Sequence, residues 1–158
     1  MSATFEDLRV LKSAEEIADA IWKQTTQWSE YPRDVEGKQL ARAADSIGAN
    51  IAESFGRFHF GEKLQFLYFA RGSLFETKYW LNRVIARGLM PLDEAQNYVS
   101  QLTVLARQLN TFADGLKQVR SGKSPQTLRE LAADYQVNLP DDFSETLLDP
   151  KDLAWLES

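Results

Sequence analysis

Apolar residues recur every three or four positions along most of the chain, which is the spacing of one face of a helix. Two neighbouring stretches, residues 39–55 and 64–85, show this pattern most clearly. The apolar positions of the first stretch are Leu40, Ala43, Ala44, Ile47, Ile51 and Phe55. We interpret the two stretches as antiparallel helices joined by a tight turn at residues 57–61.

Another helix is expected before this hairpin, because residues 10–28 also place apolar side chains at helical spacing. Ser13 and Glu16 have the spacing of a capping box, so the regular helix is expected to begin near Ser13. Residues 29–37, SEYPRDVEG, indicate a loop because they contain Pro, Asp and Gly.

A last long helix is expected after the hairpin. Gly88 suits the left-handed position that follows a helix, and Pro91 suits the first turn of the next one, which continues to Val119. Four long helices with short connections predict an all-α fold, an antiparallel up-and-down four-helix bundle.

Small and polar residues interrupt the apolar surface of the hairpin. An antiparallel register places Gly48 opposite Gly72, which predicts close backbone contact, and places Asn50 near Arg71. The polar residues of the hairpin are Asn50, Glu53, Arg57, Arg71 and Glu76. Because buried polar groups need partners, we interpret these five as a structural network that fixes the register. The alternative is a ligand-binding or catalytic site.

Charge divides the chain into two parts. Residues 1–120 hold 15 Lys and Arg against 15 Asp and Glu, whereas residues 121–158 hold 3 against 8. The whole net charge of −5 therefore falls in the second part. We expect a four-helix bundle at residues 1–120 and an acidic extension at residues 121–158. A neutral bundle lacks the basic imbalance typical of nucleic-acid-binding domains.

The extension also carries large apolar residues, including Phe143, Leu148 and Trp155. A short helix is expected at residues 126–135. The composition of residues 137–158 favours docking on a bundle surface, either its own or that of a neighbouring subunit, over a purely solvated acidic tail. A partly disordered terminus is the alternative.

Several kinds of chemistry are unsupported by the sequence. The chain has no cysteine and one histidine, His59, so neither a thiolate metal site nor a di-iron site with two Glu-x-x-His motifs can be assembled. No nucleophile elbow or dinucleotide fingerprint is present. We expect no enzyme, cofactor or metal site. The absence of a signal peptide and of a long apolar run favours a cytoplasmic protein without a membrane segment.

Two motifs of the hairpin resemble a known family, the 23S rRNA intervening-sequence proteins, which include the accessory variability proteins of diversity-generating retroelements. The family pattern SI-x-x-NIAEG-x-GR is matched by Ser46, Ile47, Asn50, Ile51, Ala52, Glu53, Gly56 and Arg57. The pattern A-x-GS-x-x-E is matched by Ala70, Gly72, Ser73 and Glu76. Ser54 stands where the family usually has Gly. The likeness covers about residues 5–120.

The resemblance implies a four-helix bundle that assembles as a homopentamer, and it implies binding to RNA or to a nucleic-acid-processing protein such as a reverse transcriptase. A non-enzymatic oligomeric adaptor is therefore the first functional hypothesis. Its candidate nucleic-acid contacts are Lys63, Arg71, Lys78, Arg83 and Arg87. Each of these could instead be a solvated or ion-paired surface residue.

A purely protein-binding scaffold regulated by its acidic tail is the second hypothesis. Both hypotheses include a homo-oligomer, because the helices carry more large aromatic residues than one thin bundle needs. Those residues include Trp22, Trp28, Tyr79 and Trp80.

Overall fold

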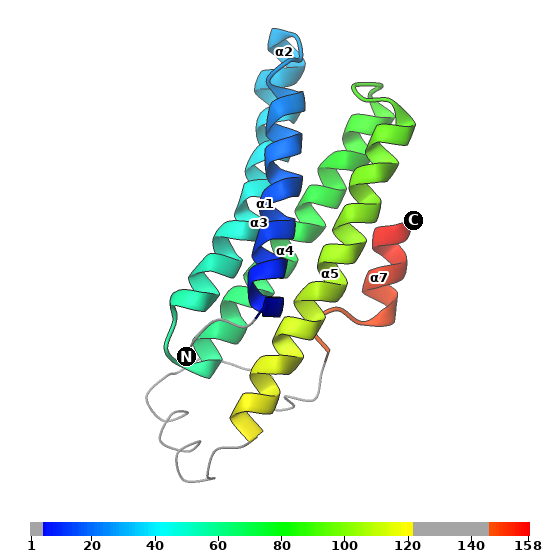
Figure 1. The fold of residues 1–158 in the computed structure, drawn as a ribbon. Coiled ribbons are helices and arrows are strands. Elements are labelled where there is room, and N and C mark those ends of the chain that lie inside the picture. The colour runs from blue at the N-terminus through cyan, green and yellow to red at the C-terminus, as the bar shows by residue number, and fades with distance from the viewer. Residues whose placement is uncertain (1–4, 122–145) are drawn as a thin grey trace.

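Four long helices run up and down in turn in the computed structural model, which describes residues 5–121 and 146–158 (Figure 1). They are α1 (Phe5–Thr25), α3 (Lys38–Gly56), α4 (Phe60–Ala86) and α5 (Leu92–Ser121). No strand occurs among the described residues. The predicted all-α, antiparallel bundle is confirmed.

The connection between α1 and α3 is helical, so the predicted loop at residues 29–37 was wrong. It consists of α2 (Glu30–Pro32) and a π-helical turn, η1 (Arg33–Gly37). Pro32 fits because the first turn of a helix leaves its N–H groups without intrahelical partners. Gly37 fits because an added Cβ would lie 3.4 Å from the Thr25 Cβ and from the Trp28 ring.

Helix α1 begins at Phe5, well before the expected start at Ser13. Val10 is fully buried and extends the apolar stripe of α1 toward the N-terminus. Burial of this side chain favours helix before Ser13, so the capping-box pattern does not mark the start of α1. The opposite case holds at the end of α4, where Gly88 has a φ of 67° as expected. There Gly88 N donates to Ile85 O and Leu89 N donates to Val84 O, which is the Schellman arrangement.

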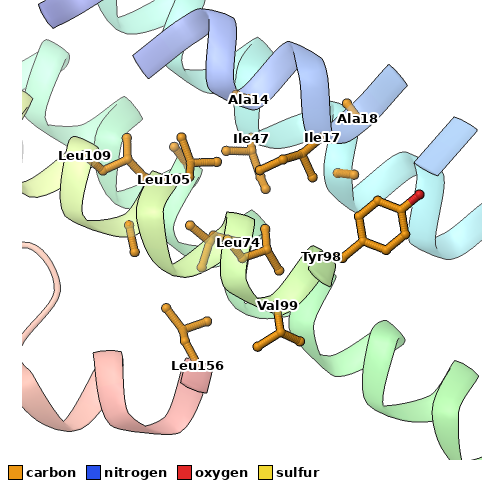
Figure 2. Packing of buried hydrophobic residues seen from close by; sticks show 14 of the residues in the cluster. Ala14, Ile17, Ala18, Ile47, Leu74, Tyr98, Val99, Leu105, Leu109 and Leu156 are labelled. Carbon is orange, nitrogen blue, oxygen red and sulfur yellow. The ribbon is translucent and has the colours of Figure 1, made fainter. Parts of the chain in front are cut away.

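The core lies along the bundle axis, where the apolar stripes of the four helices meet (Figure 2). Fully or almost fully buried members include Ile21, Leu40, Ile47, Ile51, Leu67, Leu74, Leu81, Leu102, Leu105 and Leu109. Burying an aliphatic side chain of this size contributes about 1.5–3 kcal/mol, so this stripe is the main source of stability.

A further helix, α7 (Pro150–Glu157), packs on the outer side of the bundle against α5 and α4 (Figure 1). Leu147, Leu148 and Leu156 are buried and belong to the same core cluster as the bundle residues. The expected docking of the tail is therefore seen for this segment, on the bundle of the same chain. Phe143 and the helix expected at residues 126–135 lie outside the described residues.

The predicted contact between Gly48 and Gly72 is absent. A Cβ added at Gly48 would meet the Ala14 Cβ at 3.6 Å, so this glycine faces α1. Gly72 is exposed, and a Cβ there would have nothing within 4 Å. The two helices of the hairpin are held together elsewhere along their length.

Candidate nucleic-acid interface

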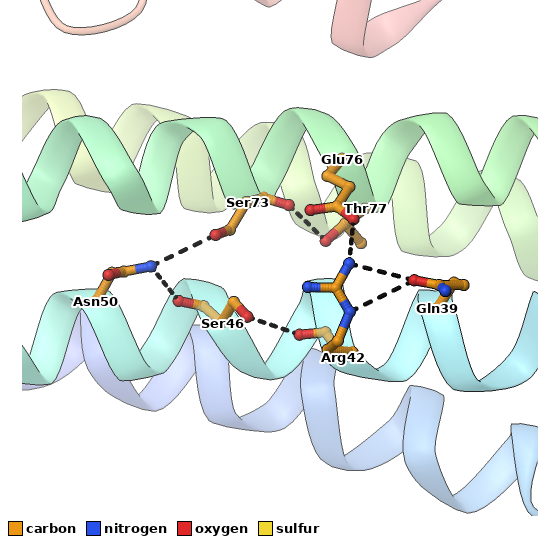
Figure 3. A network of polar contacts seen from close by, with 7 residues as sticks. All are labelled: Gln39, Arg42, Ser46, Asn50, Ser73, Glu76 and Thr77. Carbon is orange, nitrogen blue, oxygen red and sulfur yellow. Dashed lines mark hydrogen bonds and ion pairs between the residues drawn. The ribbon is translucent and has the colours of Figure 1, made fainter.

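A polar network joins α3 to α4 on one side of the hairpin (Figure 3). Arg42 is its centre: its Nη2 atom lies 2.6 Å from Glu76 Oε1 and donates to Gln39 Oε1 at 3.2 Å. The sequence singled out Glu76 but not Arg42. Both side chains are substantially exposed, so the pair contributes to register more than to stability.

Asn50 also bridges the two helices, but its partner is not the predicted one. Its amide donates to Ser46 O at 2.8 Å and to Ser73 Oγ at 3.4 Å. Arg71, which was expected beside Asn50, points instead toward α7. The five polar residues expected in one network are therefore divided among three places.

The second place is the turn between α3 and α4. Arg57 pairs with Glu53 one turn earlier and lies 3.8 Å from Glu62. Its guanidinium carbon is 4.8 Å from the centroid of the Phe66 ring.

Lys63, a predicted nucleic-acid contact, closes the end of α3. Its Nζ atom donates to the backbone oxygens of Ser54 and Phe55, each at 3.2 Å, and Ser54 Oγ donates back to Lys63 O at 2.9 Å. Two carbonyls at a helix end are satisfied in this way, so Lys63 has a structural role here.

The third place lies beneath α7. Arg71 donates from Nη2 to Asp152 Oδ2 at 3.2 Å, and its Cζ atom lies 4.7 Å from the centroid of the Phe75 ring. Lys78 follows Phe75 by one turn on the same face of α4 and is only 3% exposed. Burial lowers the pKa of the Lys78 ammonium. Two of the predicted contacts, Arg71 and Lys78, therefore share a face of α4 here.

The remaining predicted contacts lie apart from Arg71 and Lys78. Arg83 lies over the Tyr79 ring, with 5.9 Å from Cζ to the centroid, and its Nε atom is buried without a hydrogen-bond partner among the described residues. Arg87 caps α4 and pairs with Glu36 at 2.6 Å. Glu36 is itself buried, so Arg87 neutralises a carboxylate that has little access to water.

Sequence reasoning missed the residues that attach α7. Asp149 and Asp152 form a reciprocal capping box, in which each side chain accepts from the other residue's N–H at 2.9 Å. The Asp-Pro-x-Asp pattern at residues 149–152 is a recognisable helix start. Arg107, which pairs with Glu157 at 3.0 Å, had no comparable signal because its partner is 50 residues away.

A separate groove of about 730 Å³ lies between α1, η1 and α3. Trp22 and Asp45 line it, and Ala41 and Ala49 add small side chains to its wall. Burial raises the pKa of the Asp45 carboxyl, and the nearby Asp19 carboxylate raises it further. The groove combines an exposed indole with charged side chains of both signs, which are Arg33, Asp34, Lys38, Arg42 and Asp45.

Neither a metal centre nor a membrane segment emerges from the residues described. No group of three or more potential metal ligands occurs there, and no helix there is both long and apolar enough to cross a bilayer. The fold and its side chains thus define an antiparallel helical bundle in which ion pairs and helix caps engage Lys63, Arg71 and Arg87 among the predicted contacts.

The chain belongs to the 23S rRNA-intervening sequence protein family, whose model matches residues 6–111. It is also similar to a solved structure, a protein with unknown function from the S23 ribosomal protein family of Bacteroides thetaiotaomicron. The two chains are 25% identical and superpose with a TM-score of 0.64, covering 68% of this chain and 97% of the other. No curated protein matches the chain.

Proposed function

We propose that this protein is a non-enzymatic, homo-oligomeric adaptor of the cytoplasm that binds RNA, alone or together with a nucleic-acid-processing protein such as a reverse transcriptase. Membership of the 23S rRNA-intervening sequence family directs the proposal toward RNA. The structural observation that supports it is the pairing of arginines with aromatic rings along α4.

Three such pairs occur on or beside α4: Arg57 with Phe66, Arg71 with Phe75, and Arg83 with Tyr79. Phe69 and Tyr79 are also 49% and 52% exposed. Aromatic rings that stack on bases, next to arginines that contact phosphates, are the elements with which proteins bind single-stranded nucleic acid. The electrostatic part of such binding requires only a local excess of positive charge.

RNA binding is tested by fluorescence anisotropy of a labelled oligouridylate at about 50 and 200 mM salt, because phosphate contacts make affinity fall as salt rises. Arg83→Gln is expected to weaken binding a few-fold. Lys12→Gln removes the same charge from an exposed position on α1 and is the matched control. If neither the full chain nor any variant of it shows salt-dependent binding, the RNA proposal is wrong.

The homo-oligomer is proposed from the exposed aromatic residues. Trp28 and Trp80 pack against the core, but Trp22 is 59% exposed and lines the groove between α1 and α3. A pentamer would give five times the chain mass of 18.0 kDa in light scattering. Trp22→Arg is expected to lower that mass, whereas Val104→Arg, on the exposed face of α5, should leave it unchanged. A monomeric parent chain would reject the assembly.

The alternative function, a purely protein-binding scaffold, draws support from the same groove. Its exposed indole, small side chains and mixed charges are features that suit a protein surface. The two functions separate in the anisotropy assay. A scaffold would form the oligomer normally and bind the oligouridylate at neither salt concentration.

A further inference from the structure

Helix α7 lies along a strip of the bundle, where it contacts two arginines and an aromatic ring; Arg107 at its edge stays 61% exposed. The strip consists of Arg71, Phe75 and Lys78 on α4 and Arg107 on α5, and we refer to it as the covered strip. Asp152 of α7 pairs with Arg71, Glu157 of α7 pairs with Arg107, and the Trp155 ring stands edge-on to Phe75 at 5.3 Å.

The attachment of α7 is specific but confined to a short segment. Leu147, Leu148 and Leu156 are buried, and the Asn110 side chain holds both backbone polar groups of Leu148. A helix of 8 residues is too short to be stable in water by itself, so its helical form depends on docking. The family match ends at residue 111, so the fold that defines the family does not include this helix.

We propose that the covered strip is a binding site for the phosphate backbone of single-stranded RNA, and that α7 is a built-in competitor which occupies this site until RNA displaces it. This inference rests on the RNA-binding function proposed above. It assigns that function a site, a class of ligand and an internal means of control.

The chemistry of the covered strip fits a chain of phosphates. Asp152 and Glu157 are five residues apart, so they lie roughly 7.5 Å apart along the helix axis. Arg71 on α4 and Arg107 on α5 can each take a phosphate in place of the carboxylate that each holds now. The ring of Phe75, which Trp155 now contacts, would become available to a base.

Lys78 is the part of the covered strip that docking leaves incomplete. Most of the side chain is buried, but its Nζ atom is not enclosed, and it has no hydrogen bond or ion pair with any described residue. The Arg71 Nε atom is buried and without an acceptor there. An ammonium without an anion, and a guanidinium with one unused N–H, are both suited to accept a phosphate as partner. The α7 carboxylates therefore satisfy the covered strip only in part.

The test compares the full chain with a variant in which α7 is released without any change of charge, Leu148→Gln with Leu156→Gln. An oligouridylate of about 20 nucleotides is the probe, measured by anisotropy at about 50 and 200 mM salt. The released variant is expected to bind about tenfold more tightly. The slope of the logarithm of the affinity against the logarithm of the salt concentration should become more negative by about two, because three new phosphate contacts are made.

Two further variants locate the site. In the released background, Arg71→Gln should remove the gain, whereas Lys12→Gln on α1 should preserve it. If the leucine variant fails to fold, Asp152→Asn with Glu157→Gln replaces it, since this pair keeps every apolar anchor. Its matched control is Glu15→Gln with Glu16→Gln, which makes the same charge change at exposed positions on α1.

The outcomes separate this inference from the proposed function. If the full chain binds the probe and the released variant binds no more tightly, the covered strip is not the site, while RNA binding stands. A gain that survives Arg71→Gln also overturns the covered strip as the site. If no variant binds RNA, the proposed function and this inference are both wrong.

Discussion

Asn110 is the residue whose replacement best tests how α7 is held. Its side-chain oxygen accepts from Leu148 N–H at 2.8 Å, and its amide nitrogen donates to Leu148 O at 2.9 Å. Leu148 is 1% exposed, so water cannot take over these bonds while α7 stays docked. We expect Asn110→Ala to weaken the docking of α7 and to leave the four long helices intact.

The expected size of the effect follows from the two lost bonds. A hydrogen bond contributes about 1 kcal/mol net, so their loss should cost docking about 2 kcal/mol, or roughly a thirtyfold change in the docking equilibrium. Leaving both Leu148 groups buried and unpaired would cost more than this. If the mutation costs more than docking contributes, α7 simply detaches. The decrease in the free energy of global unfolding therefore cannot exceed the free energy of docking.

Native-state hydrogen exchange measures docking and global stability separately. Amides of α7 should exchange roughly thirtyfold faster in Asn110→Ala, with the amides of the bundle core unchanged. Thr111→Ala is the control: it removes an exposed hydroxyl on the next residue of α5, whose hydrogen bond to Arg107 O is local. Unchanged exchange in α7 would show that the two Asn110–Leu148 hydrogen bonds do not hold α7 in place. Equal acceleration in the core would show that α7 and the bundle open as one unit.

Gly72→Ala should raise the free energy of unfolding by about 0.5–1 kcal/mol, because Gly72 is an exposed helical glycine with open space around it. A lowered Tm would mean that a neighbouring subunit contacts this position closely. Gly48→Leu should cost about 1–3 kcal/mol in denaturant unfolding by crowding Ala14, whereas Gly48→Ala should not destabilise, and equal costs for both would contradict that packing. Asp45→Asn should raise Tm at pH 7 and lose this advantage as pH falls. The folded-state pKa of Asp45 is raised, so its charge penalty exists above that pKa and disappears as the carboxyl protonates below it. A gain that is constant down to about pH 3 would exclude this cause.

The bundle could be predicted because its signals are local. Apolar residues at three- and four-residue spacing mark all four long helices, and Gly88 marks the end of α4 through a backbone conformation that favours glycine. Predictions that relied on turn composition or on a capping pattern were wrong at residues 29–37 and at Ser13. In both places helix continues, and near Ser13 the buried side chains on either side favour it over the local signal.

The candidate site was harder to predict because its partners are distant in the sequence. Helical spacing alone puts Arg71 and Lys78 on one face of α4. It could not show that this face meets a segment 81 residues further along the chain, which supplies Asp152. The same limit applies to Lys63, since a lysine at a helix start looks solvated until the end of the preceding helix is positioned beside it.

The ion pairs that Arg71 and Arg107 form with α7 also change how the charge distribution is interpreted. Residues 1–120 sum to zero, which by itself argues against a polyanion-binding bundle. That sum ignores which carboxylate each cation holds. Asp152 and Glu157 belong to the acidic extension, while a bundle carboxylate such as Glu76 is paired elsewhere. Removing α7 from the covered strip therefore leaves two arginines without their counter-ions, on a bundle whose total charge is still zero. The local field at this strip is what a phosphate chain would meet, and that field is positive once the carboxylates of α7 have left.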